Sequence, residues 1–382
     1  MKNTQHNFGL DLARAGAILA VLFNHSAEWW LGASRQTTIQ SAFIGRAGVE
    51  LFFSLSGFLI GGILLRAIEG GLGPTALRRF WTRRWMRTLP AYWVVIVALN
   101  ALFRTHDWRS LLFLQNFMPP AEWVKLASHT WSLVLEEWFY LLMPLLLMGV
   151  LAVLGRRRVG WAAPLVCVAL IVACTSGRAL VGLEPNPVWG PDPMINPLLR
   201  LDCAAWGVLA AWLVRRRPLP RWAGLGSLLL GTALLVALGQ VWVMHFETER
   251  LVPWGFGICG GAYEPVYYSA ETLAAAFLVL GLHRLLPHGT GLVASFAGAT
   301  ARLSYSLYLV HVPVIYLGRS HGLDDTTSWT IRIVLMALVV AAALALRYAV
   351  ELPALALRDR LAPERRGRPV SDTGAPAGMS GG

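Results

Sequence analysis

The first apolar stretch of the chain, FGLDLARAGAILAVLFNHSAEWW (8–30), contains an acid, a base and an imidazole: Asp11, Arg14 and His25. Arg14 and His25 are eleven positions apart, roughly 20° more than three turns of an α-helix, so both lie on one face about 16 Å apart along the axis. Asp11 lies near the same face. Charges that face lipid are costly, so this face is expected to point into a helical bundle. It suits a substrate held across the membrane, with its anionic end near Arg14 and its reacting end beside His25. The alternative is an Asp11–Arg14 pair that locks the helix, with His25 a hydrogen-bonded interfacial residue.

A second candidate region is SHTWSLVLEEWFYLLMPLLL (128–147), where Glu136 and Glu137 begin a strongly apolar run. Adjacent helical positions point about 100° apart, so the two carboxylates cannot share one role. One can bind an arginine or a hydroxyl, while the other orients the helix near its N-terminus, where anions are favoured. A carboxylate beside an imidazole can also hold its tautomer. Alternatively, both mark the outer interface and perform no chemistry.

A third region is FWTRRWMRTLPAYW (80–93). Arg79, Arg83 and Arg87 recur every four residues and line one helix face, and Arg84 and Arg87 share a neighbouring face. Guanidinium groups match the oxygens of phosphate, which predicts a phosphate site. Binding of lipid headgroups at the cytoplasmic surface, combined with a topological role, is an equal alternative.

Several other polar residues interrupt apolar segments and give weaker signals. Glu50 precedes a run of small residues that permit close helix packing: Ser54, Ser56, Gly57 and Gly61. His311, in RLSYSLYLVHVP, is more typical of a hydrogen-bonded residue than of a catalyst. Arg200 and Asp202 begin another helix, and Glu271 lies inside an apolar segment, where it needs a polar partner. The sequence contains no GxSxG, HExxH, Walker A or GxGxxG motif.

The elements that must position these residues are membrane helices. Of the 382 residues 56% are hydrophobic and 14% are charged, against about 25% charged in soluble domains. We therefore expect an all-α polytopic membrane protein with about ten transmembrane helices. The predicted spans are 8–31, 43–66, 89–104, 132–154, 161–180, 198–214, 223–243, 267–286, 302–318 and 330–351. We expect the first span to be retained rather than cleaved as a signal peptide.

The basic residues predict that both termini lie in the cytoplasm. With this orientation, about twice as many arginines and lysines fall on the cytoplasmic side as on the outer side. In this interpretation Arg46, Arg178 and Arg200 lie in outer segments or at their edges. The net charge of +12 then reflects topology, and we expect contact with membrane lipids but no nucleic-acid partner.

The chain divides into an expected transmembrane domain (1–355) and a disordered cytoplasmic tail (356–382), which is polar and rich in Gly and Pro. The longest outer connections, near 105–130, 181–197 and 244–266, could either shape an outward-facing pocket or be inert. The four cysteines, Cys167, Cys174, Cys203 and Cys259, form no CxxC pair or Cys/His cluster. They predict neither a disulfide framework nor a metal site.

Together these motifs resemble the acyltransferase 3 family of bacterial integral-membrane O-acyltransferases. The Arg14–His25 spacing is similar to the hallmark of that family, and GVELFFSLSGFLI, FWTRRWMRTLPAYW, TWSLVLEEWFYLLMPLLL and SYSLYLVHVPV resemble its later motifs in order. The match covers about 8–350. One departure is Trp138, where Gln commonly follows the two glutamates; another is that no extra C-terminal esterase-like domain is expected.

The resemblance implies a reaction and a location. Family members transfer an acyl group, usually acetyl, from cytoplasmic acyl-CoA to a hydroxyl of a glycan or related extracytoplasmic acceptor. This implies a multi-pass protein of the bacterial inner membrane that binds no cofactor and uses acyl-CoA as a co-substrate.

The resemblance also implies roles for the candidate residues. His25 would be the general base or a transient acyl carrier, Arg14 would lie along the donor channel, and Glu136 or Glu137 would orient the imidazole or the acceptor. The implied donor- or substrate-binding residues are Arg83, Arg84, Arg87, Asp11, Trp131, Ser132 and His311. Asn24, Ser132 or a backbone N–H would stabilise the oxyanion.

Two other functions fit parts of the sequence. A carrier or flippase for a lipid-linked sugar would also need buried charges in many helices, but it would typically show paired, symmetric halves, and no clear internal duplication is present. An inactive receptor with the same fold would not need Arg14, His25, Glu136 and Glu137 to be intact. The acceptor, the length of the acyl chain and the oligomeric state are not predicted.

Overall fold

The computed structural model describes residues 7–117, 125–155, 159–182, 194–248, 264–323 and 328–363. The long helices are α1 (Phe8–Leu31), α2 (Arg35–Glu69), α3 (Pro74–Phe103), α5 (Trp131–Leu154), α6 (Val159–Gly182), α8 (Ala205–Arg216), α9 (Arg221–Thr248), α10 (Glu264–Leu285), α11 (Gly291–Ser320) and α12 (Trp329–Leu346). The shorter segments are α4 (Trp108–Leu111), η1 (Gln115–Phe117), η3 (Lys125–Thr130), α7 (Pro197–Arg200), η5 (Leu201–Ala204), the π-helical η6 (Arg347–Glu351) and α13 (Leu352–Leu361).

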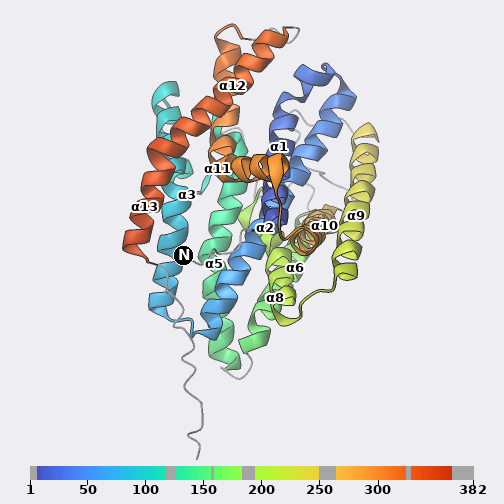
Figure 1. Ribbon diagram of the computed structural model, residues 1–382, viewed down its shortest axis with the longest axis vertical. Coiled ribbons are helices and arrows are strands. Elements are labelled where there is room, and N and C mark those ends of the chain that lie inside the picture. The colour runs from blue at the N-terminus through green and yellow to red at the C-terminus, as the bar shows by residue number, and fades with distance from the viewer. Residues whose placement is uncertain are drawn as a thin grey trace, which may run out of the picture.

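These helices form a bundle, and the described residues contain no strand, which confirms the predicted all-α class. The ten predicted spans coincide with helical structure, apart from Arg104 and Leu286, which lie one residue past the ends of α3 and α10. Eight helical segments of the described chain are long and apolar enough to cross a membrane; α1 and α11 are long but do not belong to that set. In Figure 1, α9 lies on the opposite side of the bundle from α3 and α13. The number of crossings and the cytoplasmic location of the termini stay predictions.

Two predicted spans differ from the observed helices. The third span was expected to begin at Leu89, but α3 already begins at Pro74 and continues through Pro90. The arginine run therefore belongs to the same helix, and Arg84 of this run is paired with Glu136 of α5. The sixth span is broken into α7, η5 and α8, and its 3₁₀ turn directs Arg200 and Asp202 towards neighbouring helices.

Small residues on α2 let it pack closely against α1 and α8. A Cβ atom on Gly48 would lie 2.7 Å from the carbonyl oxygen of Ala17 on α1. A Cβ atom on Gly57 would overlap the carbonyl oxygen of Ala204, at the start of α8. Because glycine has no Cβ atom, the backbones of neighbouring helices can approach closely at these positions. The small residues of this segment predict such close packing.

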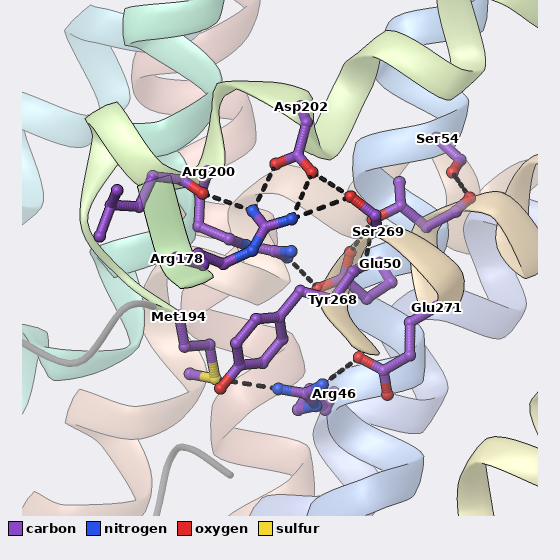
Figure 2. Close-up of polar contacts among 12 residues, drawn as sticks. Arg46, Glu50, Ser54, Arg178, Met194, Arg200, Asp202, Tyr268, Ser269 and Glu271 are labelled. Atoms are coloured by element: carbon purple, nitrogen blue, oxygen red, sulfur yellow. Dashed lines mark hydrogen bonds and ion pairs between the residues drawn. The ribbon is translucent and has the colours of Figure 1, made fainter. Parts of the chain in front are cut away.

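Three arginines form a buried ionic core with three carboxylates between α2, α6, α7–η5 and α10 (Figure 2). Arg46 pairs with Glu271, Arg200 with Glu50, and Arg178 with Asp202. All six side chains are buried. Arg46, Arg178 and Arg200 are therefore buried inside the bundle, and the side of the membrane to which the sequence assigned them stays a prediction. Each guanidinium has a carboxylate partner supplied by another element, which compensates its removal from water.

Tyr268 joins the three ion pairs. Its ring lies 4.7 Å from the guanidinium carbon of Arg46, 4.9 Å from that of Arg200 and 5.9 Å from that of Arg178. Cations are attracted to the face of an aromatic ring, especially where water is excluded. Thr272 donates a hydrogen bond of 2.6 Å to Glu50. The polar partner that the sequence predicts for Glu271 is Arg46.

The C-terminal helix α13 packs against α3. Arg83 donates hydrogen bonds to Asp359 at 3.2 Å and to the carbonyl of Ala362 at 2.6 Å. Residues 356–361, which begin the expected disordered tail, are helical in α13. The rest of that tail, from residue 364, lies outside the described residues.

Candidate active site

Two cavities lie inside the bundle on either side of a shared wall. One is lined by Arg14 of α1, and the other by His25 of the same helix. Val49 and Tyr308 line both cavities. The continuous helix α1 therefore presents its arginine to one cavity and its imidazole to the other, as their spacing on one helix face predicts.

The first cavity, of about 100 Å³, is predominantly cationic. Arg14, Arg84 and Arg87 line it together with the carboxylate of Glu136. Arg84 lies 3.7 Å from Glu136, contacts the hydroxyl of Tyr140, and stacks 3.9 Å from the ring of that tyrosine. Three guanidinium groups facing one carboxylate leave an excess of positive charge, which favours an anionic or strongly polarised ligand.

Arg87 differs from Arg84 in making no hydrogen bond and no close ion pair among the described residues. Its electrostatic neighbours are Arg14 and Arg84, which repel it, and Glu351 and Tyr140, which attract it. A guanidinium in this position is available to a ligand in a way that the anchored Arg84 is not.

The second cavity, of about 350 Å³, is larger and is lined by aromatic and hydrogen-bonding groups. His25, His129 and Asn24 line it, together with Trp29 and Trp131. The ring of His311 contacts two of these lining residues. Its centroid is 4.9 Å from that of His25 and 5.0 Å from that of His129. Flat indole faces and polar groups that converge on a cavity suit a ligand with both apolar and hydroxyl-bearing surfaces.

A chain of hydroxyl groups holds the wall between the cavities. Ser132 and Tyr308 are joined through their hydroxyls at 2.6 Å, and the tyrosine hydroxyl also donates to the backbone carbonyl of His129 at 2.7 Å. Both side chains are buried. These contacts fix the phenol of Tyr308 at the boundary that a group passing between the cavities would have to cross.

The structure separates the two glutamates predicted to assist His25. Glu136 faces the first cavity beside Arg84. Glu137 is buried and accepts a hydrogen bond of 2.8 Å from Thr88. Their different surroundings follow from the 100° between adjacent helical positions. The ring of His25 is in contact with that of His311.

The other predicted residues fall on both sides of the wall. Asp11 interacts electrostatically with Arg14, Ser132 lines the first cavity, and Trp131 lines the second. His311 is buried beside His25. Arg83 does not line either cavity and is bound to the region around α13. The roles assigned to these residues stay predictions.

Sequence reasoning missed His129 and Arg46. His129 stands two positions before Trp131 in the quoted SHTW run, and its motif could have identified it, but it belongs to a short 3₁₀ segment rather than to an apolar helix. Arg46 lines the second cavity while bound to Glu271 and stacked among Trp242, Tyr267 and Tyr268.

Most of the outer connections near 181–197 and 244–266 lies outside the described residues, as does Cys259. Cys167, Cys174 and Cys203 are buried free thiols. The expected absence of a metal site stays a prediction.

The fold and the two cavities define a multi-pass helical membrane protein with a polar site enclosed by its helices. Residues 7–348 match the model of the acyltransferase domain, so the chain belongs to that family. This assignment agrees with the resemblance drawn from the sequence motifs.

Curated relatives support the same family. The chain is 27% identical over 354 residues to the "Putative peptidoglycan O-acetyltransferase YrhL" of Bacillus subtilis, a match covering 83% of this chain and 50% of that protein. It is 24% identical over 342 residues to the "O-acetyltransferase OatA" of Staphylococcus aureus, covering 82% of this chain and 51% of that protein. The chain thus spans about half the length of these relatives. No solved structure matches it significantly.

Proposed function

We propose that this protein is a membrane O-acyltransferase that moves an acyl group, acetyl in the first instance, from cytoplasmic acyl-CoA to a hydroxyl of a cell-surface or secreted glycan. The observation that supports this proposal is the pair of cavities that meet at Tyr308 and Val49, with Arg14 and His25 facing them from one helix. A transfer between substrates that come from opposite sides of a membrane needs one cavity for each substrate. It also needs a place where the two cavities adjoin, so that the reacting groups can meet.

The cationic cavity would receive the donor. Its small volume suits the thin thioester end of acyl-CoA, and the bulky nucleotide would remain outside the bundle. Arg14 and Arg87 would contact the polar groups of that arm. Arg84, held by Glu136 and Tyr140, would form part of the fixed wall. A cytoplasmic N-terminus, as predicted from the basic residues, would put this cavity on the side where acyl-CoA is made.

The larger cavity would receive the acceptor. The indoles of Trp29 and Trp131 offer flat apolar faces on which sugar rings can lie, while Asn24 and His129 supply hydrogen-bonding groups. This combination fits a glycan hydroxyl better than a purely apolar acceptor. Two relatives whose names include O-acetyltransferase, one of them qualified by peptidoglycan, are consistent with this class of acceptor.

The reaction would take place at the wall. His25 accepts the proton of the acceptor hydroxyl while the oxygen forms a bond to the acyl carbon. The C–S bond then breaks, and the thiolate of CoA leaves and takes the proton from His25. The products are the O-acyl glycan and CoA, so the reaction needs no other reactant. Ser132 and Asn24, which lie on the two sides of the wall, are the candidate donors to the oxyanion.

The test compares cell-envelope glycans by mass spectrometry from cells that express the wild type, His25→Ala or His288→Ala. His288 is exposed and lies outside both cavities, so its variant is the matched control. An added acetyl mass on a glycan with the wild type and His288→Ala, but not with His25→Ala, would support the proposal and identify the acceptor. Equal acylation by His25→Ala would remove His25 as the base, and no added mass with any membrane-inserted protein would contradict glycan acylation.

A further inference from the structure

The tautomer of His311 is fixed by its own helix. Its Nδ1 atom lies 2.8 Å from the carbonyl oxygen of Tyr308 and 3.2 Å from that of Leu307. Carbonyl oxygens only accept hydrogen bonds, so Nδ1 must carry the proton. The distal Nε2 atom of the neutral ring is then a bare lone pair. It is buried and has no hydrogen-bond partner among the described residues.

His129 is fixed in the opposite sense. Its Nε2 atom lies 3.2 Å from the carbonyl oxygen of Leu309, so this nitrogen carries the proton. Its Nδ1 atom is a second bare lone pair, also buried and without a partner among the described residues. Two unsatisfied acceptors inside a protein are costly unless a donor reaches them.

The cluster leaves one imidazole to supply that donor. The only N–H of neutral His129 is directed to Leu309, and that of neutral His311 to the backbone of α11. Neither ring can donate to the other. Among the described residues, His25 makes no such hydrogen bond to a backbone carbonyl, and its ring centroid lies 4.9 Å from that of His311.

We propose that His311 is the positioning residue for His25: its bare Nε2 accepts the N–H of His25 and so turns the other nitrogen of His25, with its lone pair, towards the acceptor cavity. This inference rests on the proposed function, because it explains how the base of that reaction is held. A general base that activates a hydroxyl also needs a neighbouring group that fixes its tautomer. For His25 this group is the neutral imidazole of His311.

The carboxylates near the site do not fill this role. Glu136 is paired with Arg84, and Glu137 accepts from Thr88. Glu28 lines the same cavity as His25, but it is exposed and accepts a 3.5 Å hydrogen bond from Thr38. His311, in contrast, is fully buried.

The experiment compares His311→Leu with His311→Gln in purified protein or in membrane vesicles, using acetyl-CoA and the glycan acceptor found above. Leucine fills space but cannot accept a hydrogen bond. The side-chain oxygen of glutamine can reach the place of Nε2. We expect His311→Leu to lower kcat on the order of 100-fold with the KM for acetyl-CoA unchanged, and His311→Gln to recover about tenfold of that loss. His288→Leu, at an exposed position outside the site, is the control for a general effect of the substitution.

Each outcome decides the proposal. A normal kcat for His311→Leu, or an equal loss in both variants with normal folding, overturns it. If His311→Leu is absent from the membrane, the transfer activity of His311→Gln tests the proposal instead. An activity well above that of His25→Ala supports the positioning role, and an activity equal to that of His25→Ala contradicts it. An inactive wild type overturns this inference and the proposed function together, whereas an active wild type with an unaffected His311→Leu overturns only this inference.

Discussion

Arg178 of α6 and Asp202 of η5 form a two-pronged ion pair, with nitrogen–oxygen distances of 3.0 and 2.9 Å and no exposed surface on either side chain. The same guanidinium also donates to Ser269 of α10 at 2.9 Å. One residue thus connects three elements through hydrogen bonds that water does not share. Such an arrangement stabilises the bundle only while both partners are present.

Removing one partner of this pair is expected to be more harmful than removing both. Asp202→Ala leaves a buried guanidinium without its counter-charge, which costs about 3–5 kcal/mol. Arg178→Met with Asp202→Leu should recover much of that loss, because two apolar side chains replace two charges. Thermal unfolding of the detergent-solubilised protein measures both effects.

An exposed ion pair provides the control for this measurement. Arg215 and Glu69 are 36% and 52% exposed, so replacing Glu69 by Ala should cost less than about 1 kcal/mol. If Asp202→Ala were as stable as Glu69→Ala, the ionic core would not hold the helices together.

Gly57 provides a test of the close contact between α2 and α8. Gly57→Ala places a methyl group on the carbonyl oxygen of Ala204 and must push the helices apart. We expect a lower unfolding temperature and loss of transfer activity, because the ionic core and the wall of the first cavity are both built on α2. Gly62→Ala in the same helix meets only the flexible end of Arg66, at 3.8 Å, and should behave as wild type. Equal melting of the two variants would contradict the packing argument.

The helical class and the placement of Arg14 and His25 could be predicted because both depend on local sequence. Apolar length identifies a membrane helix, and helical geometry places residues eleven positions apart on one face. The separate positions of Glu136 and Glu137 follow from the same rule.

The ionic core and the imidazole cluster could not be predicted in this way. Arg200 and Glu50 are separated by 150 positions, and Arg46 and Glu271 by 225. His129 reaches the carbonyl of Leu309 across 180 positions. No periodicity within a helix carries information about such pairs, so the carboxylate partners of these arginines could not be identified from their neighbours in the sequence.

Arg87 is expected to act on the donor rather than on the acceptor. Arg87→Ala removes a cavity-lining guanidinium that makes no hydrogen bond to the described part of the protein. Loss of a charged hydrogen bond of about 1.5–3 kcal/mol to the donor predicts a rise of roughly 10- to 100-fold in the KM for acetyl-CoA. The KM for the acceptor should not change. Steady-state kinetics with each substrate varied in turn will show this, with Arg78→Ala, exposed on the same helix, as control. A selective change in the acceptor KM would assign the cavities the other way round.

Tyr308 is expected to keep water away from the donor. Its side chain lines both cavities, so Tyr308→Ala would join them and let water reach the thioester. We expect release of CoA without an acceptor to increase, while acyl transfer falls. Tyr308→Phe keeps the ring and should not release CoA in this way, although it loses the hydroxyl contacts with Ser132 and His129. A free-thiol assay without acceptor distinguishes the two variants, and no increase for Tyr308→Ala would show that the wall is formed by other groups.

The pairing of Arg46 with Glu271 also determines when the ionic core can form during synthesis of the chain. The two residues are 225 positions apart, so at about 5–20 residues per second the ribosome needs on the order of 10–45 s to add the acid after the base. Throughout that interval α2 has been synthesised while α10 does not yet exist. During this time the guanidinium of Arg46 must be solvated by water or by other protein groups. Helix α2 can therefore reach its final position only after most of the domain has been synthesised.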